Sequence, residues 1–244
     1  MNIIKNFKAK FFSKRQGDIV DSLVFHSTEI PFKESLQMLC GGTDREVSSH
    51  FLINLDGAIY QFVDTDDMAW HAGKSFWRGR EGINQYSIGF ELVDVDDNNQ
   101  TVDFTAKQMN SLVLLCKKIM AEYNIDQRNI VAHSDIAPDR KKDPGEKFDW
   151  EFMSRKGISL YHDVQIQSRL SKVKSKIGEH NSNVYLAKKL LKEIGYKIDL
   201  NDIHDIDFSS VLIAFKRRFF QNKVDDVLDD LTIEIINSVA KKFI

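Results

Sequence analysis

The segment AHSDIAPDRKKDPGEKFDW, residues 132–150, gathers several groups that could do chemistry. It contains His133, Lys141 and Asp143, together with two of the chain's three prolines. Proline removes a backbone donor and fixes φ, so a segment broken twice by proline is neither a regular helix nor a strand. A loop that holds an imidazole, an amine and a carboxylate could bind a metal ion, stabilise an oxyanion or transfer protons.

A second histidine occupies a similar position in the pattern. His26 ends the apolar run SLVFHST, as His133 ends NIVAHSD. A histidine at the end of a core strand has its backbone fixed and its ring aimed at a cleft, as a metal ligand must be. A catalytic zinc site uses three nitrogen, sulfur or oxygen ligands from the protein and leaves a fourth position to water. His26, His133 and Asp143 could be such a set, although structural histidines are the alternative that this pattern leaves open.

Glu91 interrupts the apolar strand candidate SIGFELVDV. A carboxylate in such a strand is costly to bury unless it is paired or functional. The alternative is a glutamate on the strand face that reaches solvent.

The elements around these residues alternate between the two hydrophobic periodicities up to about residue 150. Helices are predicted around 31–40 and over 104–124, the second capped by Thr105. An Asp56-Gly57 turn between two apolar runs predicts a hairpin. The predicted strands are 19–26, 50–55, 58–63, 86–95 and 129–133. This pattern predicts an α/β fold, with one sheet flanked by helices.

Beyond residue 165 the pattern is helical, over 182–195, 208–220 and 231–243. Gly195 would end the first of these helices, and Asp207 or Ser209 would cap the second. The polar and basic stretch 165–181 reads as a linker that is partly helical. We therefore predict a catalytic domain over 1–164 and a three-helix domain over 182–244.

Composition narrows the class of protein. With 244 residues, 42% of them hydrophobic, the chain can bury a full core. The net charge of −2 argues against a nucleic-acid partner that depends on a strong basic field. No apolar run approaches the ~18 residues of a membrane span. The basic start KNFKAKFFSKRQG lacks the apolar region of a signal peptide, which predicts a cytoplasmic location. We expect this segment to pack as an arm on the catalytic domain rather than to form a membrane-surface helix.

Four stretches of the sequence carry a family resemblance. They are VFHSTE (24–29), VSSHFLINLDGAIYQFVD (47–64), AWHAGKSFWRGREGINQYSIGFELV (69–93) and the opening segment itself. In this order they resemble the zinc-dependent N-acetylmuramoyl-L-alanine amidases of the AmpD/AmiD type. The resemblance covers roughly residues 6–157 and is most specific in the HSDIAP-x-R-K-x-DPG segment. It implies the mixed-sheet fold that these amidases share with peptidoglycan recognition proteins.

The resemblance also implies roles for particular residues. His26, His133 and Asp143 correspond to the ligands of one zinc ion, which lowers the pKa of its water toward ~7. Glu91 corresponds to the general base and acid that moves a proton from this water to the leaving L-alanine nitrogen. Lys141 would stabilise the oxyanion.

Residues of the segment that leads to Glu91 are candidates for substrate binding. His71, Trp77, Arg80 and Asn84 offer aromatic faces and hydrogen-bonding groups that suit a sugar peptide. For His71 the alternatives are a structural role and a role as a fourth zinc ligand. For Trp77 a position in the substrate cleft is the one interpretation.

The predicted activity is hydrolysis of the amide bond between the lactyl group of N-acetylmuramic acid and L-alanine, in peptidoglycan or muropeptides. The alternatives are a non-catalytic peptidoglycan recognition protein on the same fold and another zinc hydrolase, for which no HExxH helix is present. The C-terminal helices have a weaker resemblance to peptidoglycan-binding domains. That resemblance favours the cell envelope, whereas the missing signal peptide favours the cytoplasm. Both locations therefore stay open. A monomer is the default expectation.

Overall fold

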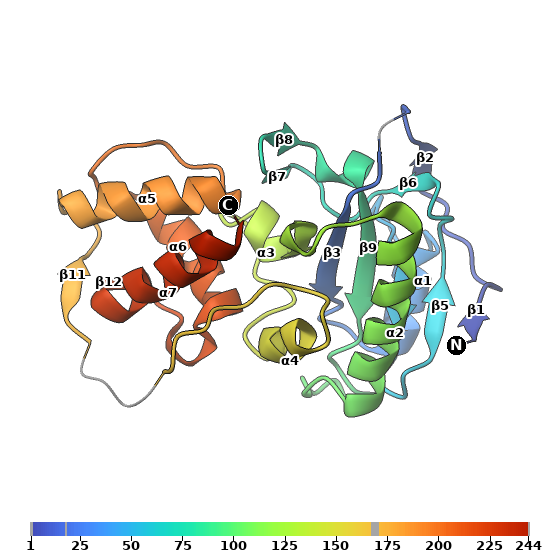
Figure 1. Cartoon of the computed structure of the whole chain (residues 1–244). Helices are drawn as coiled ribbons and strands as arrows, with labels where there is room; N and C mark the ends of the chain where they lie inside the picture. Colours follow the sequence, from blue (N-terminus) through green and yellow to red (C-terminus); the bar gives the residue numbers. More distant parts are fainter. Residues whose placement is uncertain (1, 18, 167–170, 244) are drawn as a thin grey trace. The chain divides into compact units, whose positions relative to one another are not determined.

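The computed structural model describes residues 2–17, 19–166 and 171–243 (Figure 1). Packing divides the chain into two compact units. The first consists of Met1–Ser75 and Gly82–His133, and the second of Phe76–Glu81 and Ser134–Ile244. Domain boundaries at 164 and 182 remain a prediction, and residues 167–170 of the predicted linker lie outside the described residues.

A six-stranded mixed sheet forms the centre of the first unit. The pair β4–β5 is antiparallel, whereas β1–β5, β4–β9, β9–β3 and β3–β10 are parallel. The five predicted strands all belong to this sheet, which confirms the predicted fold class. In spatial order the strands are β1 (Ile3–Ile4), β5 (Ile59–Gln61), β4 (Phe51–Ile53), β9 (Ser87–Leu92), β3 (Ser22–Ser27) and β10 (Ile130–Ala132).

The pleat of the central strands separates core residues from site residues. Phe25 of β3 and Phe90 of β9 meet edge to face, with ring centroids 5.6 Å apart, and Phe51 of β4 stacks on Phe90. Successive side chains of a strand point to opposite faces. His26 and Glu91, one position further along, therefore lie on the other face of the sheet.

The helices of the first unit begin and end close to their predicted positions. They are α1 (Phe32–Leu39) and α2 (Ala106–Tyr123), with 3₁₀ turns η1 (Ile83–Tyr86) and η2 (Gln127–Asn129). Thr105 and Gln108 form a capping box at the start of α2, which confirms the predicted cap. The amide of Gln108 also donates to the carbonyl oxygens of Ile53 and Val93, at 2.9 and 2.8 Å. These bonds fasten α2 to the sheet, along which it lies in Figure 1.

The N-terminal arm packs on the first unit. Strand β1 pairs with β5, and β2 (Phe12–Lys14) pairs antiparallel with β6 (Asp67–Ala69). The amide of Ala9 donates to the carbonyl oxygen of Phe62 at 3.1 Å. The arm interpretation is therefore confirmed in preference to a membrane-surface helix. Within the described residues, no helix combines the length and the apolar character needed to cross a membrane.

The second unit combines a hairpin, residues 134–150 of the opening segment and the C-terminal helices. Helix α3 starts at His133, the last residue of the first unit, and continues into the second unit. The elements are β7 (Phe76–Trp77), β8 (Arg80–Glu81), α3 (His133–Ile136), α4 (Trp150–Arg155), β11 (Val173–Ser175), α5 (Ser182–Ile194), α6 (Ile206–Phe219), η3 (Gln221–Lys223), β12 (Leu228–Asp229) and α7 (Asp230–Phe243).

The three C-terminal helices lie where the hydrophobic periodicity of the sequence predicted them, but the N-cap of α6 differs from the prediction. Gly195 follows α5, as predicted. Helix α6 begins at Ile206, and the carboxylate that accepts from the Phe208 amide, at 2.8 Å, belongs to Asp205. The prediction of Asp207 or Ser209 as the cap was wrong because the apolar pattern, from which the start was inferred, begins only at Phe208.

Within residues 165–166 and 171–181, the described part of the predicted linker, the structure contains a strand and no helix. Strand β11, within 165–181, pairs antiparallel with β12 at the start of α7. The sequence did not predict this pair because a ladder of two or three residues is specified by its partner strand rather than by a local pattern.

Candidate metal centre

Two predicted site residues are neighbours in the sheet of the first unit. Strands β3 and β9 run parallel in a register that pairs His26 with Glu91. Residues in register on neighbouring strands project from the same face of the sheet, and the strands lie roughly 4.8 Å apart. The sheet therefore sets the half-buried Glu91 carboxylate beside the buried His26 imidazole.

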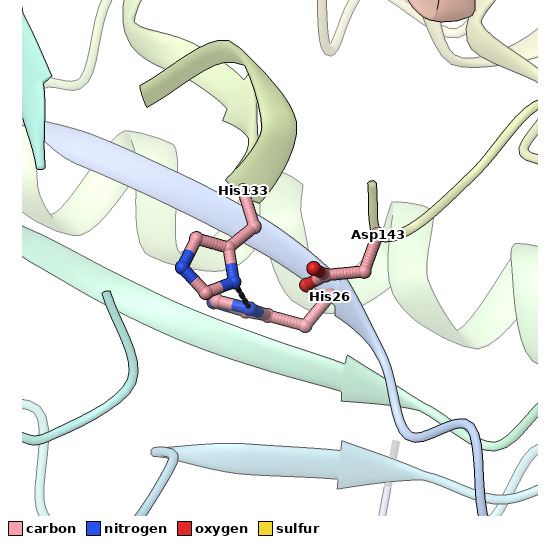
Figure 2. Close-up of side chains that lie close together, drawn as sticks. All are labelled: His26, His133 and Asp143. Carbon is pink, nitrogen blue, oxygen red and sulfur yellow. Dashed lines mark hydrogen bonds between the residues drawn. The ribbon is translucent and has the colours of Figure 1, made fainter. Parts of the chain in front are cut away.

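The three predicted metal ligands converge in the structure. Figure 2 shows the rings of His26 and His133 meeting edge to face, with the carboxylate of Asp143 beside them. Their Nδ1 atoms are 2.9 Å apart. One ligand atom from each of His26, His133 and Asp143 lies within 4.8 Å of the others, and all three residues are buried.

The ring of His133 is oriented by a backbone carbonyl group. Its Nε2 lies 3.2 Å from the carbonyl oxygen of Ala72. A carbonyl oxygen only accepts, so Nε2 carries a proton and donates it to this bond. The other ring nitrogen, Nδ1, faces His26.

A chain of hydrogen bonds orients the ring of His26. The Ser87 hydroxyl donates to the carbonyl oxygen of Ile83 at 2.7 Å, which leaves its oxygen to accept from Nε2 of His71 at 3.2 Å. Burial holds the pKa of His71 well below its usual value of 6.5, so this ring is neutral and has one proton. Its Nδ1 then accepts from Nε2 of His26 at 3.0 Å. The other ring nitrogen of His26, Nδ1, faces His133.

Two imidazole nitrogens 2.9 Å apart lie beside a carboxylate. Two imidazole nitrogens and one carboxylate oxygen are a donor set of catalytic zinc sites. Each imidazole gives its second nitrogen to a further acceptor, as metal-bound histidines do. The residues present thus fit a zinc ion.

The loop that carries Asp143 is closed at its base. The amide of Ser134, next to His133, donates to the carbonyl oxygen of Asp143 at 3.1 Å. Within the loop, Lys141 is half-buried, whereas the adjacent Arg140 and Lys142 are exposed. The structure therefore distinguishes Lys141 from the neighbours that share its charge.

His71 and Asn84, two predicted substrate contacts, have structural partners in the first unit. His71 is 8% exposed and bonds to His26, and its ring packs on Gly89. The Oδ1 atom of Asn84 accepts from the amides of His71 and Ala72, at 3.0 and 2.7 Å. Both residues support the site through its framework, and a substrate contact for either remains a prediction.

The other two predicted substrate contacts lie on the hairpin of the second unit. Trp77 is 2% exposed and meets the ring of Tyr196 edge to face, with centroids 5.1 Å apart. The ring therefore packs within this unit, and its substrate role stays a prediction. Arg80 is exposed in β8, and its substrate role stays a prediction.

Sequence reasoning missed Ser87 and Gly89, which support His71. A Cβ atom on Gly89 would lie 2.5 Å from the ring of His71, so only glycine allows this ring to lie against β9. A glycine inside an apolar strand often marks such a close approach, and this signal was available in SIGFEL.

The fold and the site define a class of protein: a mixed-sheet α/β protein with a candidate His-His-Asp metal centre at the ends of its central strands. Residues 15–146 match the N-acetylmuramoyl-L-alanine amidase family. The chain belongs to this family.

Relatives extend the similarity beyond the matched region. The chain is 33% identical to N-acetylmuramoyl-L-alanine amidase AmiD of Escherichia coli (strain K12) over 234 residues, 91% of this chain and 82% of that protein. It is 45% identical to 1,6-anhydro-N-acetylmuramyl-L-alanine amidase AmpD of the same strain over 104 residues, 43% of this chain and 55% of that protein.

Solved structures show the same fold. The E. coli AmiD complex with anhydro-N-acetylmuramic acid-L-Ala-D-gamma-Glu-L-Lys superposes with a TM-score of 0.78 at 30% identity, covering 94% of this chain and 92% of that one. AmpDh3 of Pseudomonas aeruginosa, in complex with anhydromuramic pentapeptide, superposes with a TM-score of 0.75 at 28% identity, covering 93% of each chain.

Proposed function

We propose that this protein uses one zinc ion to hydrolyse the amide bond between the lactyl group of N-acetylmuramic acid and L-alanine in muropeptides. Family membership supports the reaction. The AmiD and AmpDh3 structures contain anhydromuramyl peptides, which supports the substrate class.

The observation that carries the proposal is the convergence of two imidazole Nδ1 atoms and one carboxylate at a single point (Figure 2). A zinc ion held there by His26, His133 and Asp143 supplies Lewis-acid chemistry, since it polarises a carbonyl group and lowers the pKa of water.

The chain's own residues supply the proton transfers. Glu91, beside His26 on the same face of the sheet, accepts a proton from the attacking water and delivers it to the nitrogen of L-alanine. Without this delivery the amine would leave as an unstable anion. Lys141 donates a hydrogen bond to the oxygen of the tetrahedral intermediate, where negative charge develops.

The experiment measures cleavage of the amide bond and its dependence on bound zinc. Zinc-loaded protein is incubated with anhydro-N-acetylmuramyl-L-Ala-D-γ-Glu-L-Lys, and mass spectrometry detects the freed peptide with its new amino terminus. Metal removal by a strong chelator should abolish hydrolysis, and added zinc should restore it. Full activity of protein shown to be metal-free by elemental analysis would refute the zinc requirement, whereas binding without cleavage by the zinc-loaded protein would leave a recognition protein.

Ligand variants locate the ion. His26→Ala and Asp143→Ala should each lose bound zinc, because three protein ligands are needed to hold the ion with a free position. The control is His180→Ala, since His180 is exposed in the second unit, where its ring lies 3.3 Å from the surface carboxylate of Asp202. Equal zinc content in wild type and all three variants would show that the metal binds elsewhere.

A further inference from the structure

A buried carboxylate lies two residues after the ligand His133. Asp135, in α3, is 1% exposed and belongs to the second unit. Its Oδ1 accepts from the hydroxyl of Tyr196, at 2.5 Å, and its Oδ2 accepts from Nη1 of Arg218, at 2.8 Å. Tyr196 follows α5 and Arg218 lies in α6, so both partners come from the predicted three-helix region.

The placement of Arg218 makes this carboxylate hard to replace. The guanidinium is 1% exposed and lies over the ring of Trp150, 4.4 Å from its centroid. Within the described part of the chain, its Nε and Nη2 are buried without a hydrogen-bond acceptor. A buried charge requires an opposite charge and good hydrogen bonds. The charge of Arg218 is therefore matched to Asp135.

Tyr196 contributes a hydrogen bond of fixed direction. Burial raises the pKa of its hydroxyl well above the usual value of 10, so the group keeps its proton and donates it to Asp135. The ring itself is fixed by its edge contact with Trp77.

The end of α6 and the following turn η3 also bond to the chain just after Asp143. Nε of Arg217 donates to the carboxylate of Glu146 at 2.9 Å. The amide of Gln221 donates to the carbonyl oxygens of Glu146 and Phe148, both at 2.7 Å. The helical region therefore forms hydrogen bonds to the chain just after His133 and again just after Asp143.

The geometry points to a positioning role for Asp135, Arg218 and Tyr196. By fixing α3 and the loop that follows it, they hold the backbone of His133 and Asp143 in the arrangement that binds the metal. The C-terminal helices are thus part of the metal-binding architecture, whether or not they also bind the cell wall. This inference rests on the proposed function, because it concerns the same three ligands.

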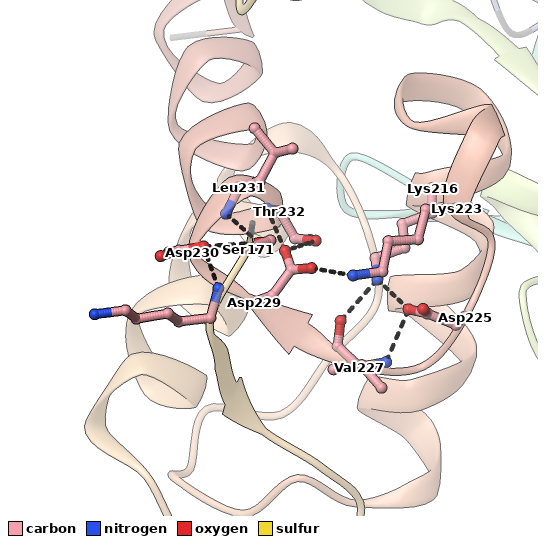
Figure 3. Close-up of polar contacts among 10 residues, drawn as sticks. Ser171, Lys216, Lys223, Asp225, Val227, Asp229, Asp230, Leu231 and Thr232 are labelled. Carbon is pink, nitrogen blue, oxygen red and sulfur yellow. Dashed lines mark hydrogen bonds and ion pairs between the residues drawn. The ribbon is translucent and has the colours of Figure 1, made fainter. Parts of the chain in front are cut away.

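The test compares Arg218 with a buried cation on the same helix that does not contact the loop. Lys216 is fully buried in α6, and its amine bonds to the carboxylate of Asp225 and to the carbonyl oxygen of Val227 (Figure 3). Arg218→Met and Lys216→Met each remove one buried positive charge and keep an unbranched apolar side chain. Both should lower thermal stability.

Only the Arg218 variant should change the metal site. We expect Arg218→Met to raise the dissociation constant for zinc about 10–100-fold, the range for groups that orient metal ligands, and to lower kcat with little change in KM. Lys216→Met should keep the wild-type zinc constant. Equal losses of stability with unchanged zinc binding in both proteins would show that Arg218 is merely structural and would overturn the inference.

Tyr196→Phe keeps the test decisive if Arg218→Met does not fold. It removes one oxygen atom and preserves the ring packing, and we expect it to weaken zinc binding; a wild-type constant would contradict the positioning role. Amide hydrogen exchange of residues 134–148 in metal-free protein separates this inference from the proposed function. Faster exchange in Tyr196→Phe than in wild type supports the positioning role even if zinc proves not to be the cofactor, and unchanged exchange overturns it.

Discussion

Glu91 stands beside His26 in the sheet, because β9 and β3 pair these two residues in register. The carboxylate proposed to transfer protons and the imidazole proposed to bind zinc are therefore positioned by the same backbone hydrogen bonds. A regular sheet holds such a pair more rigidly than two loops could.

Glu91→Gln separates proton transfer from metal binding. The amide has nearly the same shape but cannot accept a proton, so we expect kcat to fall by roughly 10²–10⁴-fold while zinc content stays at one ion per chain. Steady-state kinetics and elemental analysis check the two parts. Glu122→Gln, which removes an exposed carboxylate of α2, is the control. A Glu91→Gln protein that had lost its zinc would show that Glu91 is a ligand.

Lys141→Ala tests position against charge. If the half-buried Lys141 faces the developing oxyanion, its removal should lower kcat by roughly 10²–10³-fold with zinc retained and KM little changed. Arg140→Ala and Lys142→Ala remove the same charge from exposed neighbours, so each should stay within about twofold of wild type. Similar small losses in all three variants would mean that the loop is only electropositive, and Lys141 would have no catalytic role.

The sequence predicted the elements that carry the ligands because those elements have strong local signals. Strands β3 and β9 are long apolar runs, and α2 has both a helical stripe and a capping residue. The ladders β11–β12 and β7–β8 were not predicted, because a strand of two or three residues forms only where a partner strand meets it.

The residues that converge at the candidate metal centre were expected from the sequence, but the groups that support them were not. His26, His133 and Asp143 lie close together, and their role as ligands stays a prediction. The bonds between His26 and His71 and between Arg218 and Asp135 join residues 45 and 83 positions apart, and no local pattern encodes such a pairing. The structure thus adds the hydrogen-bond directions that orient the two imidazole rings.

His71 offers a test of those directions. His71→Leu removes the acceptor for Nε2 of His26, so that ring is free to place its proton on the nitrogen that faces His133. We expect its zinc dissociation constant to rise about 10–100-fold, as for other groups that orient a ligating histidine. Competition with a chromophoric chelator measures this constant.

His71→Asn is the matched variant, since the oxygen of its side chain lies near the position of Nδ1 and still accepts a hydrogen bond. It should retain more of the zinc affinity than His71→Leu. The two proposed roles of His71 predict different results. A residue that orients His26 changes zinc affinity, whereas a substrate contact changes KM for the muropeptide and leaves zinc affinity intact. Folded His71→Leu protein with the wild-type zinc constant and a raised KM would therefore return His71 to the substrate-binding residues.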